Sequence, residues 1–143
     1  MLKQTLVLLV LLCVAGCAGN VRNFQISLTN DTPNPLTIAL TKSGPPLEAK
    51  WASPEDVVAR RVSPDQTSGM TVIQPSKTVN STVTGRFDKN SEPVLRVYSG
   101  AMTLSEMLSA KTGVNRFDLP LSDGSNKFIV RQGGQGLNIE TVH

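Results

Sequence analysis

An alternation of apolar and polar residues with a period of two runs through most of this 143-residue chain. It is clearest at residues 23–29 and 137–142, where every second side chain is apolar or small. Successive side chains of a β-strand point to opposite faces, so this pattern places one face of each strand in a core and the other in solvent. The chain is therefore predicted to consist mainly of strands that are buried on one face.

Turn-forming segments divide the alternating stretches into eight short strands. We expect them at residues 23–29, 36–40, 69–73, 78–87, 94–99, 117–121, 128–130 and 137–142. The segments NDTPNP (30–35) and SDGSN (122–126) are typical of turns. They predict one hairpin between the first two strands and another between 117–121 and 128–130. The fold class predicted is all-β, an antiparallel β-sandwich, rather than parallel β-α-β units.

Two short helices are expected in loops of the sandwich. Ser53-Pro54-Glu55-Asp56 has a serine cap, proline at the first helical position and acids in the first turn, which predicts a helix to about residue 62. Thr103 and Glu106 have the spacing of a capping box, which predicts a second helix to about residue 110. We expect its buried side to be Leu104, Met107 and Leu108. The four phenylalanines, Phe24, Phe87, Phe117 and Phe128, all fall on predicted strands and are the expected core.

The first 16 residues have the composition of an export signal. Lys3 supplies a positive start, and residues 6–15 form a ten-residue apolar run that ends in Ala15 and Gly16. A helix that crosses a bilayer needs about 20 apolar residues, so this run is too short to be a permanent span.

Val14-Ala15-Gly16-Cys17 resembles the lipobox of bacterial lipoproteins. The resemblance implies cleavage between Gly16 and Cys17, a diacylglyceryl group on the Cys17 sulfur and a further acyl chain such as palmitate on the new amino group. Cys13 would leave with the signal. The alternative is an ordinary secretory signal peptide, with Cys17 a free thiol. A zinc or redox pair needs more ligands or a Cys-x-x-Cys spacing, which the two cysteines do not have.

The domain organisation follows from this resemblance. Residues 1–16 are the cleaved signal peptide, 17–23 the lipidated N-terminus with a short linker, and 24–143 the β-sandwich domain. The implied localisation is the bacterial cell envelope, with the protein held on a membrane by its lipid rather than spanning it. In Gram-negative lipoproteins an aspartate after the cysteine usually signals retention at the inner membrane, so by resemblance Ala18 implies the periplasmic face of the outer membrane. No disulfide is possible after Cys17, so the domain depends on packing.

The last third, LPLSDGSNKFIVRQGGQGLNIETV (119–142), resembles the closing hairpin of bacterial immunoglobulin-like and fibronectin-type-III-like modules, in which a G-x-N turn leads into an alternating strand. The resemblance implies a sandwich. The chain departs from these modules in having no cysteine pair and no tryptophan on a strand, since Trp51 lies in a loop.

Charge excludes nucleic acid as an expected partner. Without Lys3, the 14 basic residues become 13, which against 11 acidic residues leaves a net charge of +2. These charges are scattered, with Arg60-Arg61 the densest basic pair, whereas nucleic-acid binders show a clustered basic face.

Catalytic chemistry has few candidate residues. The one histidine is the final residue, His143, where a base is poorly held, and Lys111-Thr112-Gly113 resembles one element of penicillin-recognising enzymes without the other two. Asp123-Gly124 with Asn126 could suggest a calcium loop, but a hairpin turn is the preferred interpretation of these residues. We therefore expect no catalytic residue, no metal, no cofactor and no enzymatic activity.

Recognition has three candidate residues, Trp51, Leu47 and Tyr98. Trp51 and Leu47 lie in a long stretch between predicted strands, residues 44–69, where ordered loops often carry binding. Trp51 has a second interpretation, as a lid packed over the open end of the core. Two functions remain open: a structural or protein-interaction module that docks on an envelope protein, and a carrier of a small apolar ligand in a pocket between the sheets, lined by the phenylalanines.

Overall fold

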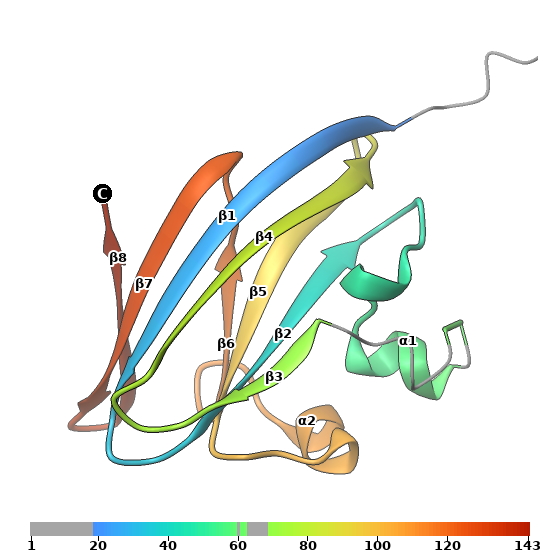
Figure 1. The fold of residues 1–143 in the computed structure, drawn as a ribbon. Helices are drawn as coiled ribbons and strands as arrows, with labels where there is room; N and C mark the ends of the chain where they lie inside the picture. The colour runs from blue at the N-terminus through green and yellow to red at the C-terminus, as the bar shows by residue number, and fades with distance from the viewer. Residues whose placement is uncertain (1–18, 60, 63–68) are drawn as a thin grey trace, which may run out of the picture.

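Two four-stranded sheets face each other in the computed structural model, which describes residues 19–59, 61–62 and 69–143 (Figure 1). The first sheet has the order β4-β1-β7-β8, from β1 (Asn20–Asp31), β4 (Thr78–Phe87), β7 (Gly124–Gly133) and β8 (Gly136–Val142). The second has the order β3-β2-β5-β6, from β2 (Leu36–Ser43), β3 (Met70–Ile73), β5 (Glu92–Ser99) and β6 (Arg116–Pro120). The prediction of an all-β sandwich is confirmed.

Strand pairing differs from the prediction at both expected hairpins. β1 pairs with β4 and, in parallel, with β7, while β2 belongs to the other sheet. Residues 30–35 are therefore a corner that carries the chain between sheets. Asn30 is fully buried there and donates from Nδ2 to Asn34 O at 2.8 Å and to Ile73 O at 3.0 Å, while its Oδ1 accepts from Thr32. These bonds give hydrogen-bond partners to polar groups that are buried where the chain passes from one sheet to the other.

The segment SDGSN is also a corner rather than a hairpin turn. It connects β6 of one sheet to β7 of the other, with Gly124 at a φ of +84°. Asn126 closes the corner by accepting from Ser122 N at 2.9 Å and donating to Ser122 O at 2.8 Å. The last hairpin of the chain lies later, between β7 and β8, where Gly133 pairs with Gly136.

The main core fills the space between the sheets. Phe24, Phe87 and Phe128 are buried in it as predicted, whereas Phe117 is only partly buried at its margin. A smaller apolar cluster lies on the outer side of the second sheet, where Ala39, Tyr98 and Met107 pack together beneath α2 (Leu104–Ser109).

Both helices begin where the sequence predicts. α1 (Pro54–Val58) follows a capping box of Ser53 and Asp56, and α2 follows the capping box of Thr103 and Glu106. α1 ends at Val58, about one turn earlier than expected, and of its last two residues Val57 is buried while Val58 is 56% exposed. The predicted buried side of α2 is wrong for Leu108, which is 39% exposed, and a 3-10 turn, η1 (Ala49–Trp51), was not foreseen.

The first strand begins earlier than the sequence suggested. β1 starts at Asn20, within the segment assigned to the linker, because residues 20–23 continue the ladder to β4. Gly16 and Cys17, and with them the lipobox, lie outside the described residues. Among the residues that are described, no helix is both long and apolar enough to cross a membrane.

Candidate functional site

The segment between β2 and β3 closes one end of the sandwich through Trp51. The Trp51 side chain is 1% exposed, and its ring packs edge-on against Phe24 and Phe87 with centroid distances of 5.4 and 5.2 Å. Its indole Nε1 donates to Thr84 O at 3.0 Å. Trp51 is therefore a lid on the core in this structure and offers no surface to a partner.

Gly85 on β4 makes room for this lid. A Cβ atom at position 85 would lie 2.5 Å from Trp51 Nε1 and 2.6 Å from a ring carbon of Phe87. Contacts that short do not occur, so the indole can approach β4 only because residue 85 has no side chain.

Lys42 and Glu48 form an ion pair beside the same lid. The Lys42 side chain is 2% exposed, and its Nζ donates to Glu48 Oε2 at 2.6 Å and to Arg86 O at 2.8 Å. Glu48 Oε2 also accepts from Arg86 N at 2.9 Å. Burial alone would raise the pKa of Glu48, but the hydrogen bonds from Lys42 and Arg86 N–H outweigh it and hold that pKa below its ordinary value.

These contacts also cover part of the free edge of β4. Trp51 and Lys42 donate to the carbonyls of Thr84 and Arg86, and Glu48 accepts from the Arg86 amide. An uncovered edge strand is a template for pairing with another chain. Side chains from the end of β2 and from the connection that follows it thus protect the end of β4 that lies nearest the start of β1.

A second ionic cluster holds α1 against the outer face of β5 and β6. Glu55 contacts Arg96 at 2.7 Å and Arg116 at 3.9 Å, and Arg116 binds Asp118 at 2.8 Å. Partial burial opposes the charge on Glu55, yet hydrogen bonds from its own backbone amide and from Arg96 lower its pKa below the ordinary value. The positive charges of two guanidinium groups balance the negative charges of two carboxylates. The cluster therefore carries no net charge for a ligand and serves to attach α1 to the sheet.

Tyr98 packs beneath α2 and is fully buried. Within the described part of the chain, its hydroxyl and the neighbouring Arg96 Nε have no hydrogen-bond partner. Burial raises the pKa of Tyr98, more than the adjacent Arg96 lowers it. Of the three residues predicted to be available for recognition, Leu47 alone is exposed, with half of its surface free, because Trp51 and Tyr98 both lie in the interior.

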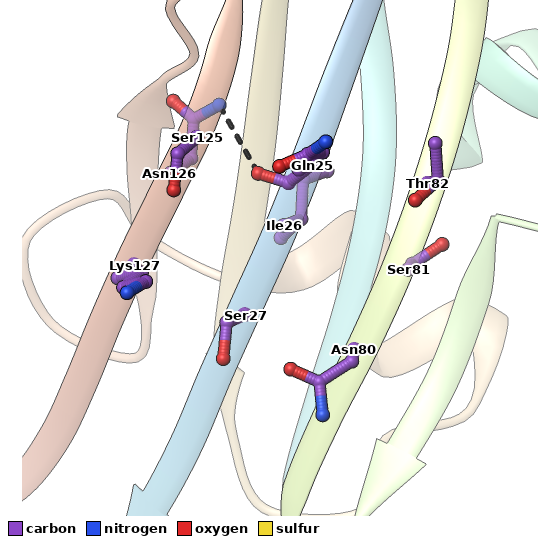
Figure 2. Close-up of a pocket in the computed structure, with 9 residues that line it drawn as sticks. All are labelled: Gln25, Ile26, Ser27, Asn80, Ser81, Thr82, Ser125, Asn126 and Lys127. Carbon is purple, nitrogen blue, oxygen red and sulfur yellow. Dashed lines mark hydrogen bonds between the residues drawn. The ribbon is translucent and has the colours of Figure 1, made fainter.

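The outer face of the first sheet has a shallow hollow of about 330 Å³ (Figure 2). Its polar lining comes from the outward side chains of β1, β4 and β7, with Gln25, Ser27, Asn80, Thr82 and Ser125 around the single charged residue, Lys127. Such residues are usual on the solvated face of a sheet. The lining holds serine and threonine hydroxyls and one lysine amine, but no carboxylate, imidazole or thiol. Its hydroxyls therefore have no histidine or carboxylate in the hollow to activate them as nucleophiles.

The remaining candidates for chemistry lie at separate places in the chain, except that His143 and Asn126 line one hollow of about 300 Å³. His143 follows β8 and is exposed. Lys111-Thr112-Gly113 forms an exposed loop after α2, and the C-cap residue of that helix is Ala110 rather than Gly113. Asp123 lies 2.6 Å from Arg22, in an ion pair. In the described ranges no three His, Cys, Asp or Glu side chains come close enough together to hold a metal ion.

Comparison with known proteins finds distant likenesses among solved structures. No family model matches the chain, and no curated protein matches it. The crystal structure of the T6SS lipoprotein TssJ1 from Pseudomonas aeruginosa matches with a TM-score of 0.37 and 10% identity over 87% of this chain and 98% of that one. Serratia marcescens Lip, a membrane-bound component of the type VI secretion system, matches with a TM-score of 0.39 and 13% identity over 85% and 98%. Likenesses this distant carry no argument about this chain.

Proposed function

We propose that this chain is a lipid-anchored lipoprotein of the bacterial cell envelope that acts as a structural or protein-interaction module and not as an enzyme. The observation that carries the proposal is the position of Cys17. The cysteine of a lipobox-like segment stands three residues before Asn20, where the first strand of a packed β-sandwich begins. Processing at Gly16 would therefore leave a folded domain with a lipid attachment point at its start.

The packing inside the domain favours the function of a structural or interaction module over that of a carrier of a small apolar ligand. A crevice between the sheets, lined by Ile26, Ile38, Leu40 and Leu95 among others, has a volume of about 80 Å³. Pockets for small organic ligands usually measure about 300–1,000 Å³. Phe24 and Phe87, which were expected to line a ligand pocket, instead pack edge-to-face with each other at 5.5 Å.

The charged groups likewise support a role without catalysis. Lys42 with Glu48, and Glu55 with Arg96 and Arg116, are engaged in ion pairs that hold loops onto the sheets. The placement on the periplasmic face of the outer membrane, which follows from Ala18 by resemblance, belongs to the same proposal.

Replacing Cys17 with serine tests the anchor. Without the thiol there is no acceptor for the diacylglyceryl group, so we expect the intact mass of the product to lack acyl chains. Wild-type protein should fractionate with membranes and carry that mass, because several acyl chains give stable anchoring.

The matched control is Cys13→Ser, which removes the other cysteine and should leave acylation and cleavage unchanged. A purified wild-type protein that starts upstream of Cys17, or that carries no acyl mass on it, would contradict the proposal.

A further inference from the structure

One end of the sandwich gathers the start of β1 and three connections. Asn20 pairs with Phe87, the last residue of β4, so the β4–β5 turn at 88–91 lies beside the start of β1. The connection after β2 lies against that turn, since Ser91 Oγ donates to Pro45 O. The β6–β7 corner joins them through Arg22 and Asp123. We call this the N-terminal end, and Figure 1 shows it opposite the end that carries α2.

The chain between this end and Cys17 is very short. Gly19 already packs on β4, because a Cβ atom there would lie 3.0 Å from Phe87 O. Only Ala18 stands between Gly19 and Cys17. Three residues span at most about 10 Å when fully extended. A ten-residue strand such as β4 is about 33 Å long, so the tether is short compared with the domain that it holds.

Exposed apolar side chains occur at the N-terminal end. Val21 is 69% exposed and Leu47 is 50% exposed. The charges of the end are balanced: residues 20–22, 42–48, 86–92 and 121–123 contain four basic and four acidic side chains. Electrostatic attraction to anionic lipid is therefore weak, and any preference of this end for a membrane depends on the tether and on apolar contact.

We propose that the N-terminal end rests on the lipid surface, with Leu47 and Val21 directed into the interface between headgroups and acyl chains. This inference rests on the proposed lipid anchor at Cys17. It identifies the partner of Leu47 as the membrane itself, and it leaves α2 and the β7–β8 turn at the end that faces away from the membrane.

Fluorescent labels at single cysteines test this orientation. Once Cys13 is removed with the signal and Cys17 is acylated, the mature chain has no free thiol, so Leu47→Cys and Val21→Cys each create a unique labelling site. Val114→Cys is the matched control, because Val114 is 64% exposed and lies beside Asn115, which accepts from Ser99 at the far end of β5. Thr82→Cys reports on the outer sheet face.

The acylated full-length proteins are reconstituted in phosphatidylcholine vesicles that contain a lipid with a spin-labelled headgroup. Quenching at positions 47 and 21 should exceed that at 114 and 82 by at least about twofold, because the tether of about 10 Å holds one end closer than the other. Replacing part of the phosphatidylcholine with phosphatidylglycerol should leave this ratio unchanged.

Equal quenching at both ends, or quenching at 82 or 114 as strong as at 47, overturns the orientation. Acyl mass and flotation with the vesicles are measured on the same samples. Labelled single-cysteine protein that floats and carries acyl chains but shows uniform quenching defeats this inference alone. Protein without acyl chains defeats the proposed function as well.

Discussion

Replacing Trp51 with alanine is expected to lower the free energy of unfolding by about 4 kcal/mol, within the range for truncating a buried aromatic side chain. The indole is 1% exposed and contacts two further aromatic rings. Its removal would open a cavity at the N-terminal end and leave Thr84 O without its donor. The loss is measured by urea unfolding of the detergent-solubilised protein, followed by far-ultraviolet circular dichroism.

Gly85 provides a second measurement of the same contact. Gly85→Ala should destabilise the domain by about 2 kcal/mol, because the new methyl group overlaps the indole, whose Nε1 would lie 2.5 Å away. In the double variant with Trp51→Ala the overlap with the indole disappears, while the one with the Phe87 ring at 2.6 Å remains, so the two losses should sum to more than the observed loss. A Trp51→Ala loss below about 1 kcal/mol, or strict additivity in the double variant, would contradict the packing described for the lid.

The strands could be predicted from the sequence because each depends on a local pattern. At Phe24, Ile26 and Leu28 the alternation alone states which side chains face inward, and these residues are buried as expected. The partners of a strand depend on contacts that are distant in sequence. The turn-forming residues 30–35 are compatible with a hairpin and with a corner. The corner contains a bond from Asn30 to Ile73, 43 positions away, which no local pattern could predict.

At the candidate site too, features with a local sequence signal could be predicted, and features that depend on distant contacts could not. Trp51 stood out in the sequence as a lone tryptophan outside the strands, and the lid was one of its two interpretations. The alternation of β5 turns Tyr98 away from Leu95 and Val97, which suggests solvent, yet the outer face of that sheet is covered by α2. The pairing of Lys42 with Glu48 has no sequence signal beyond a separation of six residues, because it depends on where the chain returns after β2.

The Lys42–Glu48 pair gives the second large effect. Glu48→Gln should cost about 2 kcal/mol at pH 7, less than the full penalty for breaking a buried pair because Glu48 retains 24% side-chain exposure. It leaves the Lys42 ammonium, 2% exposed, without an ionised partner. Lys42→Met removes the buried charge itself and fills similar space, so we expect a smaller loss from it than from Glu48→Gln.

The pH dependence of this effect has a definite sign. The pKa of Glu48 is lower in the folded protein than in the unfolded chain, so the unfolded chain binds the proton more readily. The stabilisation is complete above the unfolded pKa, about 4.3, and is lost as the pH falls through the lower folded value. Wild type and Glu48→Gln should therefore converge in urea unfolding once the pH has fallen below the folded pKa of Glu48, which lies under its ordinary value. Glu92→Gln, at an exposed position of the same end, is the matched control and should change stability by less than about 0.5 kcal/mol. A difference between wild type and Glu48→Gln that persists unchanged at low pH would show that the carboxylate charge does not carry the effect.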